Sequence, residues 1–298
     1  MLAAKQAATT FTAAASPADI GGLALAVDDL VKSGSVKVPM LPQVATQVLQ
    51  AASDDKCDAA RLSGLIHKDP ALAGRVLKIA NSPLYMAKSP LVSLQQAVAR
   101  LGFATLTEIA LAASVESGVF AVPGFEHEIQ ALWHESLATA AFAKEIARLR
   151  RLNVETAFLC GLLADIGRPV VLQAVVDLAR KQKLSTGAPE VRACLLDLAS
   201  RFAGATTQSV VKAWQLPAAV QAAASHRDEP AAAGPHVKDA AIAGAARWLA
   251  LNLLHPSADA VPLHEQGAFV LLNLYRDDAA ALVAKGDAVK KAVLGLAS

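Results

Sequence analysis

Residues 126–151 read EHEIQALWHESLATAAFAKEIARLRR, and this stretch decides the fold class. Apolar side chains recur in it three, four or seven residues apart, at Ala131, Ala138, Phe142, Ile146 and Leu149. That spacing places them on one side of a single long helix. Almost every other periodic segment has the same spacing, and none alternates convincingly with the period of two that a half-buried strand needs. The sequence therefore predicts an all-α protein.

The composition agrees with a folded helical chain and excludes several classes. Of 298 residues, 54% are hydrophobic and 18% charged, so the bulk of the chain is not disordered. The abundant alanine favours helix, because alanine loses no side-chain entropy there. The net charge of +2 argues against a dedicated nucleic-acid coat or a polybasic membrane anchor. The best candidate for a membrane span, residues 156–176, is interrupted by Asp165, Arg168 and Pro169.

Capping and breaking residues delimit the helices. Asp69 before Pro70 is a strong start signal, and Ser93 followed by Gln96 forms a capping box. The segment 229–235 is predicted to be a loop. Besides short helices after Asp58, Asp69 and Ser93, the expected helices cover 18–33, 42–52, 103–118, 126–151, 154–163, 170–182, 189–203, 205–214, 217–226, 237–254, 264–275 and 278–294.

The Val122-Pro123-Gly124 break separates two helical groups. We expect residues 18–122 to form an N-terminal subdomain and residues 126–298 a second subdomain with the C-terminal helices, packed against each other. Residues 1–17 are predicted to be a disordered tail. Cys57, Cys160 and Cys194 lack metal-site or disulfide spacing and are predicted to be reduced thiols of a cytoplasmic protein.

Three ionisable residues in apolar helical contexts are candidates for a site: His134, Asp165 and His226. A histidine at the flank of an apolar stripe is commonly half-buried and hydrogen-bonded, which is the structural alternative for His134. Asp165 follows an apolar run, where a carboxylate is costly to bury unless it is paired. It could cap the helix that begins near Gly167, pair with Arg168, or pair with His134. The basic run at 144–151 is interpreted as a solvated helix end.

Several segments together resemble one family. Residues 161–167 (GLLADIG) resemble the GLLHDIG signature of the HD superfamily of metal-dependent phosphohydrolases, and residues 133–137 (WHESL) resemble its first-histidine helix. Residues 65–85 resemble a block of the HDOD domain, the HD-related output domain. Residues 38–42, 93–102 and 213–226 resemble its further motifs in the family's order. The resemblance covers roughly residues 36–230 and implies two helical subdomains, the second HD-like.

The departures from the HD pattern bear on activity. In an HD enzyme the first histidine, the His-Asp pair and a later aspartate hold metal, which activates a water against a phosphoester. Here His134 and Asp165 match, but Ala164 replaces the central histidine and Ala203 aligns with the next one. His226 stands where some relatives have two histidines, and residues 240–258 contain no carboxylate for the closing aspartate. The resemblance thus implies a degenerate site that holds no metal or other cofactor.

The family resemblance implies a bacterial cytoplasmic signalling module that acts without catalysis. It would bind a protein partner or a small ligand in a cleft between the two halves, near His134, Asp165 and His226, with Trp133, Arg168 and Trp214 as candidate contacts. The tryptophans could instead be core anchors. No nucleic acid or membrane is expected as a partner, and a monomer or a homodimer is compatible. The alternative is a residual metal-dependent phosphohydrolase or phosphodiesterase that uses His134 and Asp165.

Overall fold

The computed structural model describes residues 17–52, 57–82, 85, 90–256 and 265–297. Within these ranges the regular structure is helical and contains no strand, so the all-α prediction is confirmed. The helices are α1 (Pro17–Lys32), α2 (Gln43–Ala52), α3 (Ala59–Ile66), α4 (Pro70–Ala80), α5 (Leu94–Leu101), α6 (Phe103–Val119), α7 (Glu126–Arg150), α8 (Val154–Leu162), α9 (Gly167–Lys181), α10 (Pro189–Ala213), α11 (Ala218–His226), η2 (Pro230–His236, a 3₁₀ helix), α12 (Val237–Leu254), α13 (Gly267–Leu271), α14 (Arg276–Ala284) and α15 (Gly286–Leu296).

Side-chain caps set the helix starts that the sequence signalled. The Asp69 carboxylate accepts from the backbone N–H groups of Ala71 and Leu72, at 3.0 and 3.1 Å, with Pro70 at the first helical position. The Ser93 hydroxyl accepts from the N–H of Gln96 at 3.2 Å. The caps satisfy backbone donors that a helix N-terminus otherwise leaves unpaired.

Several predicted boundaries were wrong. Residues 189–213 form the single helix α10, because Gly204 keeps a helical conformation inside it and weakens it without breaking it. The predicted loop 229–235 contains 3₁₀ turns (η2), which are interrupted at Gly234, where the backbone angles are non-helical (φ 57°, ψ −123°). The predicted helix 278–294 is divided into α14 and α15 at Lys285–Gly286. Residues 257–264 and the predicted tail 1–16 lie outside the described residues, and Pro17 already begins α1.

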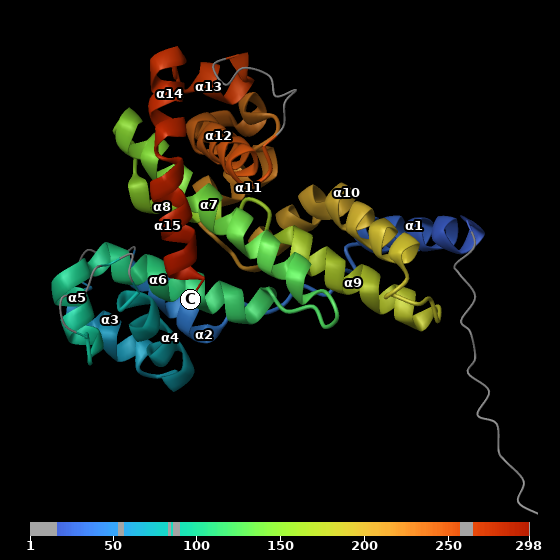
Figure 1. Cartoon of the computed structure of the whole chain (residues 1–298), viewed down its shortest axis with the longest axis horizontal. Helices are drawn as coiled ribbons and strands as arrows, with labels where there is room; N and C mark the ends of the chain where they lie inside the picture. The colour runs from blue at the N-terminus through green and yellow to red at the C-terminus, as the bar shows by residue number, and fades with distance from the viewer. Residues whose placement is uncertain (1–16, 53–56, 83–84, 86–89, 257–264, 298) are drawn as a thin grey trace, which may run out of the picture.

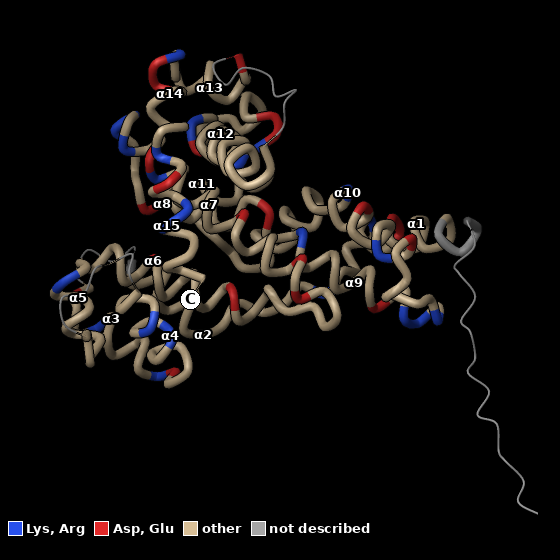
Figure 2. Tube along the Cα trace, viewed as in Figure 1, with Lys and Arg blue, Asp and Glu red and all other residues tan. Residues whose placement is uncertain are grey.

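The helices form two packed groups (Figure 1). Helices α2 to α6 contact one another in the first group, at the lower left of Figure 1. In the second group α7 packs against α8 and α12, while α9 packs against α10 and α11 against α12. Helix α1 differs from the prediction, because it packs against α9 and α10 of the second group. Figure 2 shows Lys and Arg interleaved with Asp and Glu along both groups.

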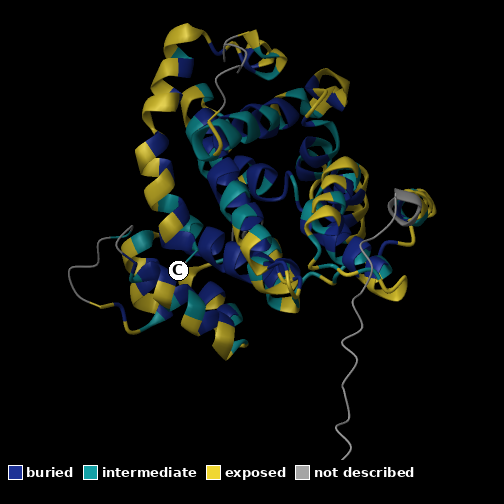
Figure 3. Cartoon of the chain, turned by 45° about the vertical axis from the view of Figure 1, so that its right-hand side comes forward, coloured by how far each residue is buried: buried dark blue, intermediate teal, exposed yellow. Residues whose placement is uncertain are grey.

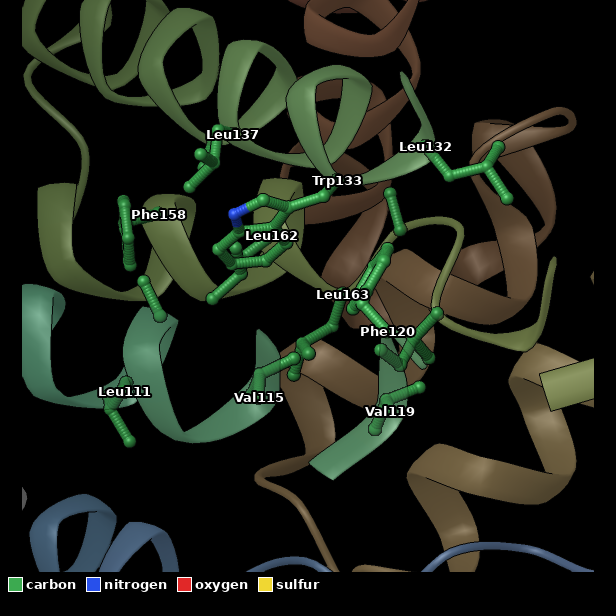
Figure 4. Close-up of a cluster of buried hydrophobic side chains, with 14 of the residues drawn as sticks. Leu111, Val115, Val119, Phe120, Leu132, Trp133, Leu137, Phe158, Leu162 and Leu163 are labelled. Atoms are coloured by element: carbon green, nitrogen blue, oxygen red, sulfur yellow. The ribbon is translucent and has the colours of Figure 1, made fainter. Parts of the chain in front are cut away.

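A continuous apolar core joins the two groups. Figure 3 shows the buried segments where the helices cross and the exposed ones on the outer faces. Figure 4 shows part of this core, a cluster to which α6 contributes Leu111, Val115 and Val119 and α7 contributes Trp133 and Leu137. Helix α15 contacts both α6 and α7, so the C-terminal helix also bridges the groups. The halves are therefore packed, as predicted from the short Pro-Gly break.

Among the residues that the structure describes, one helical stretch, Val154–Lys181, is long and apolar enough to cross a membrane by length and composition. Its most apolar window is 72% buried inside the protein. Such burial is typical of a core segment in a globular protein, which passes the same test.

Candidate functional site

Asp165 lies in the short turn between α8 and α9, and two glycines place this turn against neighbouring helices. A Cβ on Gly161 would stand 2.7 Å from the Cα of Ala140 on α7. A Cβ on Gly167 would stand 2.2 Å from the backbone nitrogen of Thr207 and 2.5 Å from the carbonyl oxygen of Ala203, both on α10. Any larger residue would push the helices apart, so both glycines of the GLLADIG stretch are needed for helix packing.

A third close approach brings α12 to the end of α11. A Cβ on Gly244 would stand 2.3 Å from the carbonyl oxygen of Arg227. Arg227 directly follows α11, and Arg247 lies one turn beyond Gly244 on α12. The contact therefore carries two arginines toward the Asp165 turn.

The two arginines hold the Asp165 carboxylate from both sides. Arg227 Nη2 lies 2.9 Å from Asp165 Oδ1, close enough for an ion pair although not aligned as a hydrogen bond. Arg247 Nε donates a hydrogen bond to Asp165 Oδ2. The side chains of Arg227 and Asp165 are only 6% and 17% exposed. Charges this far from water need such pairing.

The arginines also set the charge state of Asp165. Burial alone would raise the pKa of its carboxyl, but attraction to Arg247 and Arg227 outweighs the burial and holds the pKa below its usual range. Asp165 is therefore an anion at neutral pH, and its charge is already balanced by the protein.

A second carboxylate, Glu135 of α7, lies beside this cluster. Arg168 Nη1 donates to Glu135 Oε2 at 3.0 Å, and His255 Nε2 lies 3.0 Å from Glu135 Oε1. Glu135 and Asp165 border the same narrow gap of about 10 Å³, which is room for one water molecule at most. Arg168 thus pairs with Glu135. The observed ion pairs of Asp165 are with Arg227 and Arg247, and differ from the helix cap, the Arg168 pair and the His134 pair considered from the sequence.

The structure does not bring the predicted site histidines to Asp165. His134 is half-buried on α7 and lines a different cavity of about 350 Å³, together with Trp133, Phe120 and Ala297. Loss of water contact lowers the pKa of His134. His226 is half-buried at the end of α11, and it is its neighbour Arg227 that reaches Asp165. His134 and Asp165 therefore line separate cavities, and His226 lines neither of them.

The other predicted site residues have packing roles. Ala164 is buried beside Asp165, and Ala203 is buried against Gly167. Trp133 is 2% exposed and packs against Phe120, with ring centroids 4.9 Å apart and ring planes tilted by 57°, so it is a core anchor. Trp214 Nε1 donates to the carbonyl oxygen of Pro39 at 2.8 Å, which ties the end of α10 to the segment before α2.

The residues around Asp165 do not fit a metal ion. Two guanidinium groups occupy the directions from which a cation would approach the carboxylate, and they repel it. Across the described ranges, no three His, Cys, Asp or Glu side chains converge as a metal site would require. The cluster is arranged to hold charge pairs.

Sequence reasoning missed Glu135, Arg227 and Arg247. The available signal was the composition of residues 240–258, which lack a carboxylate but contain Arg247. Arg227 next to His226 was a second signal. Neither could be assigned to Asp165 from the sequence, because the three segments meet only through the close contacts of Gly161, Gly167 and Gly244.

A family model, the HDOD domain, matches residues 38–230. The chain belongs to the HDOD domain family. The match confirms the resemblance seen in the sequence motifs between residues 36 and 230. Helices α12 to α15 lie beyond the matched region, so Arg247 is contributed by a segment outside the family model.

Solved structures share this fold. An HDOD domain protein of Geobacter sulfurreducens is 22% identical with a TM-score of 0.66, covering 93% of this chain and 98% of its own. A Shewanella amazonensis protein, named provisionally as a metal-dependent phosphohydrolase, is 19% identical with a TM-score of 0.66, covering 94% and 98%. A Marinobacter aquaeolei protein, named provisionally for signal transduction, is 20% identical with a TM-score of 0.65. The match covers 94% of this chain and 69% of that protein's chain.

One curated relative was also matched. A Treponema pallidum protein of uncharacterised role is 25% identical over 146 residues, which is 48% of this chain. The matched region spans only 28% of that protein's length. These likenesses concern the fold and the family, and they leave the activity to be argued from the site.

Proposed function

We propose that this HDOD protein is a non-catalytic signal-transduction module of the bacterial cytoplasm, which acts by binding a protein partner or a small ligand. The observation that carries the proposal is the ion-paired state of Asp165 between Arg227 and Arg247. The carboxylate that an HD enzyme would use for metal is bound here to the protein's own cations. The likeness in fold to a protein named for signal transduction supports the same conclusion.

The cost of freeing Asp165 makes catalysis the weaker candidate. A metal would have to displace at least one guanidinium from a carboxylate that is 17% exposed, and leave a buried arginine unpaired. Breaking a buried ion pair in this way costs about 3–5 kcal/mol. A metal site would have to recover that free energy from its other ligands, and the histidine expected among them, His134, lines another cavity.

The competing candidate is a residual metal-dependent phosphohydrolase that uses His134 and Asp165. The provisional name of the Shewanella amazonensis protein favours it. The two candidates differ in metal content and in turnover, so one set of measurements separates them.

The test is metal analysis of the purified protein with a phosphodiesterase assay on bis-p-nitrophenyl phosphate in Mn²⁺ and in Mg²⁺. We expect substoichiometric metal and no turnover above buffer for the wild type, Asp165→Asn and His134→Ala. Arg201→Ala, which removes an exposed ion pair on α10, is the matched control. Stoichiometric metal together with turnover that Asp165→Asn or His134→Ala abolishes would establish the phosphohydrolase instead.

The charge distribution guides the search for partners. Lysine and arginine alternate with acidic residues along the chain (Figure 2), and the net charge is +2. A nucleic-acid partner would favour a continuous basic stripe. We therefore expect a protein or a small ligand, with the module acting as a monomer or a homodimer, and a pull-down from native cells to recover a protein rather than nucleic acid.

A further inference from the structure

We propose that a cavity beside Asp165 binds a small organic anion through Arg227 and Arg247. The cavity measures about 360 Å³ and lies between the end of α11, α12 and α13. Its polar lining comes from Arg227, Asp228, Arg247, Asn252 and Gln266, and Trp248 and Phe269 are part of its apolar wall. The inference rests on the proposed role as a binding module and names the class of ligand.

Unused donors on the two arginines point to a ligand. Arg227 Nε is buried and has no hydrogen-bond partner, although it forms an ion pair at 3.6 Å with the exposed Asp228 carboxylate. Arg227 Nη1 donates a hydrogen bond to the carbonyl oxygen of Ala224, and Nη2 forms the ion pair with Asp165. Nε is therefore the buried nitrogen of this guanidinium that has no hydrogen-bond acceptor. Buried polar groups without partners are rare, because each costs the free energy of its lost hydration.

Arg247 adds a second guanidinium at the same cavity. Its Nε is bound to Asp165, and the described residues give its terminal nitrogens no hydrogen bond, although Asp228 and Glu135 also attract its charge. The side chain is 29% exposed and lines the cavity, so a ligand there would contact Arg247. The planar fork of a guanidinium matches the two oxygens of a carboxylate or phosphate.

The remaining lining favours an anion that carries an apolar body. Trp248 and Phe269 provide apolar surface, and the cavity volume lies within the range of small-molecule sites. The Asp228 side chain is 72% exposed, so solvent screens its repulsion of an anion. An inorganic ion would use the arginines alone, whereas an organic phosphate or carboxylate would use both parts of the cavity.

An anion at this position would act on the Asp165 turn. The same two guanidinium groups that would hold the ligand also hold the carboxylate between α8 and α9. A ligand that draws either arginine toward the cavity weakens its ion pair with Asp165. Binding would thus alter how firmly α11 and α12 are tied to the turn, which is the differential contact that a signalling response requires.

The experiment is calorimetric titration of the full chain with phenyl phosphate at low salt, compared with inorganic phosphate and phenol. We expect one molecule of phenyl phosphate to bind per chain. The affinity for inorganic phosphate should be at least about tenfold lower, and phenol should not bind. Salt at about 0.15 M should weaken the binding, because the attraction is largely electrostatic.

Two variants test the site independently. Ala268→Phe adds a ring to the cavity wall without touching Asp165, and Arg247→Lys keeps the charge but removes the fork. Each should weaken phenyl phosphate binding at least about tenfold. Arg201→Lys, at the exposed pair on α10, should leave it unchanged. Urea unfolding of each variant verifies that it is folded.

The proposal is overturned if the wild type binds no phenyl phosphate, or if Ala268→Phe and Arg247→Lys both bind it as the wild type does. Neither result would contradict the proposed function as a non-catalytic module. Release of phenol from phenyl phosphate in the presence of Mn²⁺ or Mg²⁺ would contradict the proposed function instead.

Discussion

Replacing Arg227 with methionine should destabilise the protein by about 2–3 kcal/mol. The Arg227 side chain is 6% exposed, and it faces a carboxylate that is 17% exposed at 2.9 Å. Removing one member of a buried ion pair costs about 3–5 kcal/mol when the remaining charge is left without a partner. Asp165 keeps Arg247 in this variant, so we place the cost below that range. Methionine retains much of the buried aliphatic volume.

A double-mutant cycle isolates the ion pair from the loss of packing. Urea unfolding at pH 7 would be measured for the wild type, Arg227→Met, Asp165→Asn and the double variant. The losses in free energy of unfolding of the two single variants, added together, should exceed the loss in the double variant by at least about 1 kcal/mol, because the residues interact directly. The control Arg201→Met, at a pair exposed by 63% and 57%, should cost less than about 1 kcal/mol.

The same ion pairs predict a pH dependence. The folded-state pKa of Asp165 lies below its ordinary value, so its charge stabilises the protein fully above the unfolded-state pKa of about 3.9. That contribution disappears as the pH falls through the lower folded-state pKa. The stability difference between the wild type and Asp165→Asn should therefore shrink below about pH 4.

The reasoning would be refuted by either of two results. One is an Arg227→Met variant within about 0.5 kcal/mol of the wild type, with no coupling to Asp165. The other is a wild-type advantage over Asp165→Asn that stays constant from about pH 5 to pH 3.

The remaining predictions concern packing and reactivity. Gly167→Ala should lower the free energy of unfolding by at least about 2 kcal/mol in urea, because its Cβ would stand 2.2 Å from the Thr207 nitrogen. Gly204→Ala should raise the free energy of unfolding by about 0.5–1 kcal/mol, because a Cβ there would have no atom within 4 Å. A loss of stability at Gly204 equal to that at Gly167 would contradict the steric explanation. Trp214→Phe should cost about 1 kcal/mol through the lost hydrogen bond to Pro39, and an unchanged thermal midpoint would exclude that role. Burial raises the pKa of the Cys160 thiol, so Cys160 should react with a thiol reagent only in denaturant. The half-buried Cys57 and Cys194 should react before it. Rapid labelling of Cys160 in the folded protein would contradict this prediction.

Local sequence signals predicted the individual helices well where capping was strong. Asp69 with Pro70, and Ser93 with Gln96, begin α4 and α5 where expected, because their bonds involve residues close in the chain. The prediction failed at Gly204, where a weak helix former remains inside α10. It also failed for α1, because nothing within residues 17–32 indicates that its partners are α9 and α10.

The sequence by itself determined the helical class, the family and the loss of the central histidine at Ala164, because these depend on residue types and short spacings. Only the tertiary structure decided what Asp165 does. Its partners Arg227 and Arg247 are 62 and 82 residues away in the chain, and they reach it through helix contacts that no local pattern encodes. A charge pair depends on distances of a few ångströms between side chains, and those distances are fixed only when the helices pack.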